Sequence, residues 1–333
     1  MRAMVLGKIG MIDSSPLKAR EVAEPHAARG EVRIKVEVCA ICRTDLHVIE
    51  GELPPMKADI IPGHQVVGVV DEIGPSSTRF RIGDRVGIGW LRWTCGECRF
   101  CKSGSENLCP RARFTGYMEN GGYAEYAVVP EAYAYALPGK LDSISIAPLL
   151  CAGIIGFRAL KQANLKPGTR VGLWGFGSSA HIAIQVALHW GCKVYVSTRD
   201  KKHQELSLAL GATWAGDGAE QPPEKVDSAI MFAPVGTLVP PALESLEMGG
   251  TLAIAGIHLS DIPALNYERH LFHEKTLRSV TANTREDGEE LLQIAAEMGL
   301  RPTTTTFPLA DANIALQKLK HDGINGSGVL IVS

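Results

Sequence analysis

The sequence VGLWGFGSSAH at residues 171–181 decides the fold of this 333-residue chain. A short apolar run ends at Trp174, and a turn with Gly175 and Gly177 follows it. A helical pattern then begins, with Ala180 in its first turn. Glycine lets such a turn close and lets the backbone approach a pyrophosphate, while the helix N-terminus supplies N–H donors. The GxGxxA spacing between a strand and a helix therefore predicts a dinucleotide-binding site.

Helix and strand patterns alternate around this turn. Helices are expected at 151–164, 178–190 and 201–210, and strands at 170–174, 193–198, 226–232, 251–255 and 276–281. Strands joined in series by helices form a parallel, doubly wound sheet of the Rossmann type. We place this α/β coenzyme-binding domain at residues 150–284.

The first 149 residues have a different pattern. Their short apolar or alternating runs are EVRIKVEV at 31–38, HQVVGVVDEIG at 64–74, DRVGIGW at 84–90 and YAEYAVV at 123–129, with Gly and Pro between them. These runs are typical of β-strands, so residues 1–149 are expected to form a β-rich domain, a small irregular barrel. Residues 285–333 are too few for an ordinary independent domain, so we expect them to pack back on the first one.

Composition and charge exclude several classes of function. Hydrophobic residues make up 45% of the chain and charged residues 21%, as in globular proteins. Because 34 Lys and Arg stand against 36 Asp and Glu, there is no electrostatic case for binding nucleic acid or a membrane. No signal peptide or membrane-spanning run is evident. We expect a cytoplasmic protein whose partners are small molecules or copies of itself.

Four cysteines stand in the segment CGECRFCKSGSENLC at 95–109. Thiols stay reduced in the cytoplasm, so this spacing favours a tetrahedral zinc site over disulfides. The ligands would be Cys95, Cys98, Cys101 and Cys109.

Three further candidate ligands are far apart in sequence. They are Cys42 in ICRTDLH, His64 in PGHQVVG and Cys151 in LLCAGIIG. Each alone could be an ordinary buried side chain. One His and two Cys together would leave one position of a tetrahedral zinc open for water or substrate, as catalytic zinc requires.

The order of these motifs resembles the zinc-dependent alcohol dehydrogenases of the medium-chain dehydrogenase/reductase superfamily, over essentially the whole chain. The bacterial-type members that oxidise primary alcohols are the most similar. The resemblance implies a GroES-like catalytic domain, a Rossmann coenzyme domain with the active site in the cleft between them, and a homodimer or homotetramer.

The resemblance also implies the roles of individual residues. Cys42, His64 and Cys151 would bind a catalytic zinc, and the four-cysteine segment a structural one, giving two zinc ions per chain. Thr44 would pass the alcohol proton toward the nicotinamide ribose and then His47, which faces solvent, and Asp45 would orient His64 from behind the metal. Arg43 would face the cofactor pyrophosphate, and Trp90 would line the substrate pocket.

The zinc would lower the pKa of a bound alcohol, so that hydride could pass to a nicotinamide ring. The end of the second Rossmann strand indicates which nicotinamide cofactor is used. NAD-binding proteins carry an Asp or Glu there, whereas this chain has Ser197, Thr198 and Arg199. Hydroxyls and a guanidinium suit a phosphate better than a ribose hydroxyl, so the sequence favours NADP over NAD. The alternative is that Asp200, one or two positions after the usual place of the acid, serves as the ribose-binding residue of an NAD site.

Three positions depart from the family pattern. Gln65 replaces the usual Glu after the zinc histidine, Ile155 stands where many relatives have Thr, and Ser327 stands where relatives often carry a pyrophosphate-binding Arg. We expect changed metal exchange from the first departure and altered cofactor binding from the other two.

Other functions remain open at this point. A polyol or cinnamyl-type dehydrogenase could share the fold, although polyol enzymes commonly use Glu where this chain has Cys151. A non-catalytic zinc-binding protein is a further alternative. Zinc ribbons separate their two cysteine pairs by about 15 to 20 residues, which disfavours that class here.

Overall fold

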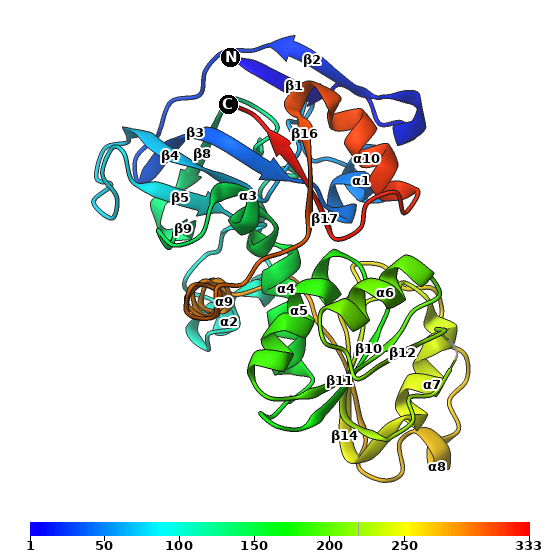
Figure 1. The fold of residues 1–333 in the computed structure, drawn as a ribbon. Helices are drawn as coiled ribbons and strands as arrows, with labels where there is room; N and C mark the ends of the chain where they lie inside the picture. The colour runs from blue at the N-terminus through cyan, green and yellow to red at the C-terminus, as the bar shows by residue number, and fades with distance from the viewer. Residues whose placement is uncertain (219) are drawn as a thin grey trace. The chain divides into compact units, whose positions relative to one another are not determined.

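The computed structural model describes residues 1–218 and 220–333 (Figure 1). The chain divides into two compact units. Unit 1 consists of Met1–Cys151 and Ala282–Ser333, and unit 2 of Ala152–Thr281. The candidate ligand Cys151 is thus the last residue of the first segment of unit 1.

Unit 1 is built mainly from strands. They are β1 (Arg2–Leu6), β2 (Leu17–Glu21), β3 (Glu31–Ala40), β4 (Val66–Ile73), β5 (Arg85–Ile88), β6 (Leu91–Trp93), β7 (Arg113–Phe114), β8 (Tyr126–Pro130), β9 (Ala134–Ala136), β16 (Thr304–Pro308) and β17 (Ser327–Ile331). Its helices are α1 (Arg43–Glu50), α2 (Arg99–Lys102), α3 (Ser143–Ile146), α9 (Arg285–Met298) and α10 (Ala312–Lys320). Short 3-10 turns are η1 (Ile12–Ser14), η2 (Glu106–Leu108), η3 (Glu131–Tyr133), η4 (Ala147–Leu150) and η6 (Leu309–Asp311).

Strand β3 is the centre of the main sheet of unit 1. One edge pairs with β4, and the other pairs first with β8 and then with β17, all antiparallel. Val32, Ile34 and Val36 alternate along β3 and are completely buried, because successive side chains of a strand point to opposite faces. The alternating pattern that predicted this strand therefore marks the core of unit 1.

The C-terminal segment completes this sheet. Strand β16 pairs in parallel with β17, and β17 pairs with the end of β3, where Leu330 lies opposite Cys39. Figure 1 shows β17 beside β3 although they are distant in the sequence. The C-terminal segment thus covers the edge of β3 near Ala40, at the end of the strand that precedes Cys42.

The prediction of β-structure for the N-terminal region missed helix α1. It begins directly after Cys42, whose N–H donates to Oδ2 of Asp45 at 2.8 Å, and it ends at Gly51 in the left-handed conformation. A carboxylate in the first turn and a glycine after the last are ordinary helix boundary signals. The helix has only eight residues, too few to show a clear period among the strand patterns around it.

Unit 2 is a doubly wound α/β structure, as predicted. Its elements are α4 (Ala152–Gln162), β10 (Arg170–Trp174), α5 (Ser178–His189), β11 (Lys193–Ser197), α6 (Lys201–Ala209), β12 (Trp214–Gly216), β13 (Val226–Met231), η5 (Gly236–Leu238), α7 (Val239–Glu244), β14 (Leu246–Ile254), α8 (Tyr267–His270) and β15 (Thr276–Ser279). Among the described residues, six parallel strands lie in the order β12-β11-β10-β13-β14-β15. Strand β14 begins five residues earlier than its predicted start at 251.

The strand order of unit 2 reverses direction between β10 and β13. In Rossmann folds this switch point opens a crevice at the carboxyl ends of the strands, where a dinucleotide binds. Gly175 follows β10 at this point with φ of +86°, and a Cβ there would lie 2.8 Å from the backbone nitrogen of Ala233. Glycine is therefore required at this turn.

Candidate active site

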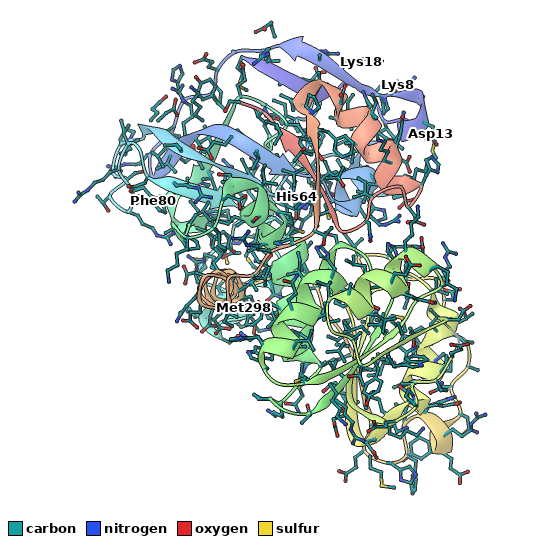
Figure 2. The ribbon with its side chains drawn as sticks, viewed as in Figure 1. Lys8, Asp13, Lys18, His64, Phe80 and Met298 are labelled. Atoms are coloured by element: carbon teal, nitrogen blue, oxygen red, sulfur yellow. The ribbon has the colours of Figure 1, made fainter. Side chains whose placement is uncertain are left out.

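The fold of unit 1 brings Cys42, His64 and Cys151 together. One potential ligand atom of each lies within 4.8 Å of the others, although the residues come from three separate segments. Cys42 precedes α1, His64 precedes β4 and Cys151 follows η4. Figure 2 shows His64 in the interior of unit 1. The three residues that sequence analysis selected form one cluster.

A buried carboxylate joins two of these residues. Oδ1 of Asp45 lies 3.0 Å from Nδ1 of His64, and Oδ2 accepts the backbone N–H of Cys42 at 2.8 Å. Oδ2 also accepts the hydroxyl of Tyr123 at 2.9 Å. Burial, with the negative charge of Asp45, raises the pKa of Tyr123 well above its usual range, so the phenol stays a donor. Sequence analysis predicted the contact of Asp45 with His64 but missed Tyr123.

The second nitrogen of His64 is the atom of this residue that a metal could bind. Nε2 is buried and has no partner in hydrogen-bond geometry within the described structure, although the sulfur of Cys42 is close enough to act on it electrostatically. A buried polar atom without a partner is costly unless a ligand satisfies it. Two sulfurs and this nitrogen are the donor set of a catalytic zinc, so the residues fit such an ion.

The charges of the cluster favour a cation. A hydrogen bond from Cys151 holds the pKa of Cys42 well below its usual range, and the same contact raises that of Cys151. Burial would lower the pKa of His64, but Asp45 and Cys42 outweigh it and raise it to about 10. These shifts favour the thiolate form of Cys42, and a divalent cation bound here would take the place of protons on His64 and Cys151.

Helix α1 carries the predicted relay residues on one side. Thr44 and His47 are three positions apart, a spacing that places side chains on the same helix face. The hydroxyl of Thr44 lies 3.6 Å from the sulfur of Cys42, and Nδ1 of His47 hydrogen-bonds Glu52. Arg43, predicted to face the pyrophosphate, is exposed and forms an ion pair of 2.7 Å with Asp322.

An aromatic cluster lies against the imidazole. The ring of Trp90 meets that of His64 edge to face, with 4.9 Å between centroids. Trp90 also stacks on Phe114 at 5.0 Å and on Tyr117 at 6.0 Å. Sequence analysis proposed Trp90 but missed both partners, because nothing in the local sequence indicates which aromatic rings pack together.

The sulfurs of Cys95, Cys98, Cys101 and Cys109 also lie within 4.8 Å of one another. We call residues 95–109 the four-cysteine lobe. Its own backbone supports it, since the N–H of Cys98 donates to the sulfur of Cys95 at 3.4 Å. All eight cysteines of the chain are free, so the disulfide alternative does not apply. Four converging thiols match a closed tetrahedral zinc site.

One residue of the lobe links it to the C-terminal segment. Buried Glu106 accepts hydrogen bonds from the backbone and guanidinium of Arg285, the shortest at 2.6 Å. Burial would raise the pKa of Glu106, but Arg285 outweighs it and lowers the pKa below its usual value. The guanidinium also covers the ring of Tyr133. This ion pair connects positions 179 residues apart.

In unit 2, the structure separates the residues predicted to select the cofactor. Ser197 is buried and directs its hydroxyl to the carbonyl of Glu220 at 3.3 Å, and Thr198 is also buried. Arg199 is exposed. Asp200 caps helix α6 by accepting the N–H of Lys202 at 2.8 Å. Arg199 is therefore the exposed member of the predicted set, and Oδ1 of Asp200 accepts a helix N–H.

The Gly-rich turn itself has the predicted form. Gly177 is the N-cap of α5, and Ala180 is completely buried in the first turn. Nearby, His181 is buried with Nδ1 3.4 Å from the carbonyl of Gly177, and burial lowers its pKa to about 4. His181 is thus a buried, neutral packing residue.

The three departures from the family pattern have different surroundings. Gln65 and Ser327 are each 1% exposed, whereas Ile155 is half-buried. The side chain of Gln65 is thus a neutral amide, buried next in sequence to the candidate ligand His64.

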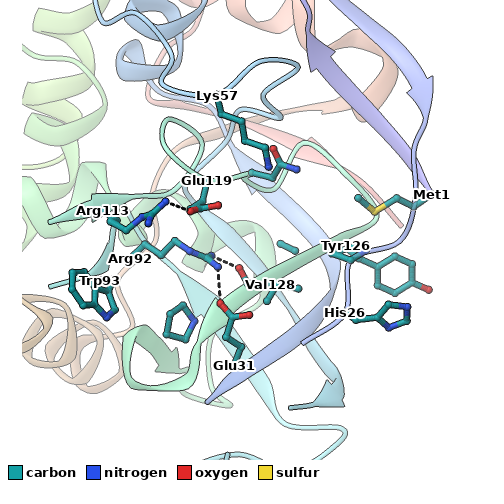
Figure 3. Close-up of a pocket in the computed structure, with 14 residues that line it drawn as sticks. Met1, His26, Glu31, Lys57, Arg92, Trp93, Arg113, Glu119, Tyr126 and Val128 are labelled. Atoms are coloured by element: carbon teal, nitrogen blue, oxygen red, sulfur yellow. Dashed lines mark hydrogen bonds and ion pairs between the residues drawn. The ribbon is translucent and has the colours of Figure 1, made fainter. Parts of the chain in front are cut away.

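A separate cavity of about 460 Å³ lies in unit 1 (Figure 3). Its lining includes Arg92 and Arg113, but Arg92 pairs with Glu31 at 3.1 Å and Arg113 pairs with Glu119. None of the candidate ligands lines this cavity. Because the candidate ligands lie elsewhere, we assign this cavity no part in the chemistry.

Two family models match the chain. The alcohol dehydrogenase GroES-like domain matches residues 28–139, and the zinc-binding dehydrogenase model matches residues 180–297. The probable alcohol dehydrogenase AdhA of Mycobacterium tuberculosis (strain CDC 1551 / Oshkosh) is 50% identical over 337 residues, covering 100% of this chain and 97% of its own. The chain belongs to the zinc-type alcohol dehydrogenases of the medium-chain dehydrogenase/reductase superfamily.

Solved structures agree with this membership. The cobalt- and zinc-bound thermostable alcohol dehydrogenase from Pyrobaculum aerophilum has a TM-score of 0.90 at 26% identity, covering 100% of this chain and 99% of its own. The CAD from Helicobacter pylori complexed with NADP(H) has a TM-score of 0.89 at 25% identity, covering 99% of both chains. The predicted family, the two-domain fold and NAD(P)-dependent alcohol oxidation are therefore confirmed.

The length and hydropathy of its helices bear on whether the chain could cross a bilayer. Within residues 1–218 and 220–333, no single helix is long and apolar enough to cross one. Two short stretches, 143–150 and 152–162, reach that length and hydropathy only when counted together.

Proposed function

We propose that this alcohol dehydrogenase holds a catalytic zinc at Cys42, His64 and Cys151 and interconverts a primary or secondary alcohol with its aldehyde or ketone. The buried Nε2 of His64, without a hydrogen-bond partner and beside two thiols, carries this proposal. When bound, the zinc would supply a Lewis acid that lowers the pKa of the alcohol.

The residues around the metal would orient the ligands and move the proton. Asp45 would hold Nδ1 of His64 protonated, leaving Nε2 as the ligand atom. Thr44 would accept the alcohol proton at its hydroxyl and pass it toward His47, which is partly exposed and hydrogen-bonded to Glu52. The proton would thus leave a buried site, as general acid–base chemistry requires.

We propose that the four-cysteine lobe binds a second, structural zinc. Its four thiols would close the coordination sphere and leave no position for substrate. This metal would then stabilise the lobe without taking part in hydride transfer.

We propose NADP as the preferred cofactor. Exposed Arg199 follows the second Rossmann strand, where a 2′-phosphate would lie, and Lys202 is exposed just beyond it. Asp200 caps the start of α6 with its Oδ1, which restrains the direction of its carboxylate. The related Helicobacter pylori structure contains NADP(H). Arg199→Ala should raise KM for NADP about tenfold and leave KM for NAD unchanged, since one charge-assisted contact is lost.

A primary alcohol is the first candidate substrate, and an aryl or cinnamyl alcohol is the second. The stacked rings of Trp90, Phe114 and Tyr117 favour the second, since aromatic substrates pack well against such surfaces. We further propose that the enzyme is a cytoplasmic homodimer or homotetramer, as in its family, which sedimentation would test.

One experiment tests these proposals together. Ethanol, benzyl alcohol, cinnamyl alcohol and a polyol would each be assayed with NAD and NADP, alongside zinc analysis of the purified protein. Turnover of an alcohol, two zinc equivalents per chain and a higher kcat/KM with NADP are expected. A clear preference for NAD, or zinc-free protein with full activity, would contradict the corresponding proposal.

A further inference from the structure

Three donors converge on the carboxylate of Asp45. Oδ1 faces Nδ1 of His64, while Oδ2 accepts both the backbone N–H of Cys42 at 2.8 Å and the hydroxyl of Tyr123 at 2.9 Å. Asp45 is 1% exposed and Tyr123 is fully buried. In such surroundings no water replaces a lost hydrogen bond, so each donor determines how the carboxylate is oriented.

Tyr123 is itself held firmly. Its N–H donates to the carbonyl of Pro62 at 3.0 Å, and its carbonyl accepts the N–H of Met4 at 2.8 Å. Its ring lies against Gly63, which has φ of +95° and where a Cβ would lie 2.4 Å from the ring. The ring therefore packs on the residue before His64, and its hydroxyl reaches the carboxylate that binds His64.

We propose that Tyr123 is a positioning residue for the catalytic metal centre, acting through Asp45. By donating to Oδ2, its hydroxyl would stop the carboxylate from rotating and keep Oδ1 facing His64. The imidazole would then stay in the tautomer whose Nε2 faces the two thiols. This inference rests on the proposed zinc site and adds a residue that acts one step behind Asp45.

The alternative is that Tyr123 only fills space between Gly63 and β1. Tyr123→Phe separates the two roles, because it keeps the ring and its packing and removes only the hydroxyl. Tyr135→Phe is a matched control. Tyr135 is also buried, at 3% exposure, and its hydroxyl accepts a hydrogen bond from Nδ2 of Asn283 at 3.3 Å.

The first test is zinc retention. Both purified variants would be exposed to a chelator, and zinc content, melting temperature, kcat and KM would be followed over time. Tyr123→Phe should lose one zinc equivalent about tenfold faster than the wild type, with kcat reduced about threefold to tenfold and KM nearly unchanged, since loss of such supporting groups weakens metal sites by about 10- to 100-fold. Tyr135→Phe should retain zinc like the wild type. Equal release rates in the two variants would overturn the proposal.

The second test is whether Tyr123 acts through Asp45. Asp45→Asn and the double variant with Tyr123→Phe would be compared by the same chelator assay. If the hydroxyl acts on the carboxylate, adding Tyr123→Phe to Asp45→Asn should not accelerate zinc loss further. Additive rates would mean that Tyr123 acts by another route and would refute the inference.

The Cys42→Ala variant distinguishes a failure of the proposed zinc site from a failure of the inference about Tyr123. If this variant keeps the same zinc content as the wild type, the catalytic zinc site itself is wrong, and the inference falls with it. If it loses one equivalent while Tyr123→Phe behaves like the wild type, the zinc site stands and the positioning role of Tyr123 alone is rejected.

Discussion

The two cysteine centres of unit 1 are assembled in opposite ways. The ligands of the four-cysteine lobe come from one segment, 95–109, and a backbone N–H within that segment supports them. Cys42, His64 and Cys151 come from three segments and meet only because β3, β4 and η4 pack around a common core. A local centre needs short-range order, whereas a non-local centre requires the folded sheet.

Their surroundings differ accordingly. In the lobe three of the four cysteines are partly exposed, and the link to the rest of unit 1 includes the ion pair of Glu106 with Arg285. At the other centre His64 is buried, and Asp45 connects it to the backbone of Cys42. The lobe is suited to stability and the buried centre to chemistry, which the following variants can separate.

The largest effect is expected from Cys42→Ala. We expect kcat/KM to fall about a thousandfold or more, which corresponds to about 4 kcal/mol, because the Lewis acid loses a ligand. Zinc analysis should show one equivalent lost and one retained. Steady-state activity with the metal gone would contradict the assignment of Cys42.

Cys101→Ala should give the reverse pattern. Loss of a lobe ligand should lower the melting temperature by about 5 °C or more, because structural metal binding contributes to folding free energy. The kcat/KM of the remaining folded protein should stay within about threefold of the wild type. If this variant instead loses activity as Cys42→Ala does, without a change in melting temperature, the two centres are not functionally separate.

Glu106→Gln tests how the lobe is attached. The pKa of Glu106 is lowered below the ordinary Glu value of 4.5. Its ion pair therefore contributes fully to the stability of the fold at pH values above 4.5, and this contribution is lost as the pH falls through the lowered pKa. We expect the variant to be less stable by about 2 kcal/mol at pH 7, a value reduced for the partial exposure of Arg285. Denaturant titrations should show the difference shrinking below about pH 4.5. A constant difference across this range would exclude a role for the charge.

The smallest effect is expected from Tyr133→Phe. The hydroxyl of Tyr133 accepts the N–H of Thr94 at 2.9 Å, directly before Cys95. It also shares a hydrogen bond of 2.7 Å with the hydroxyl of Thr94. Its removal should cost about 1 to 2 kcal/mol of unfolding free energy, the usual range for two hydrogen bonds, with no change in kcat/KM. Calorimetry and a steady-state assay would check both. A fall in activity would show that the lobe communicates with the catalytic centre.

Local patterns predicted much of this protein. The turn at Gly175 and Gly177 and the flanking strand and helix of unit 2 follow from short segments with strong periodicity. The four-cysteine lobe is likewise contained in one segment. Helix α1 was missed because eight residues give a weak helical signal.

Burial distinguishes the three residues predicted to select the cofactor. Ser197, Thr198 and Arg199 are adjacent in sequence, and all three were expected to face a phosphate. Ser197 and Thr198 point into the protein, and only Arg199 of these three is exposed. The sequence alone does not show where a strand ends and how its last side chains turn.

The sequence by itself determined the family, the Rossmann turn and the identity of both candidate ligand sets, because these depend on residue types at short or characteristic spacings. Only the tertiary structure decided that Tyr123 binds Asp45, 78 residues away, and that Trp90 stacks on Phe114 and Tyr117. It also paired Glu106 with Arg285. Such contacts depend on which elements the folded chain brings together, and no local propensity records them.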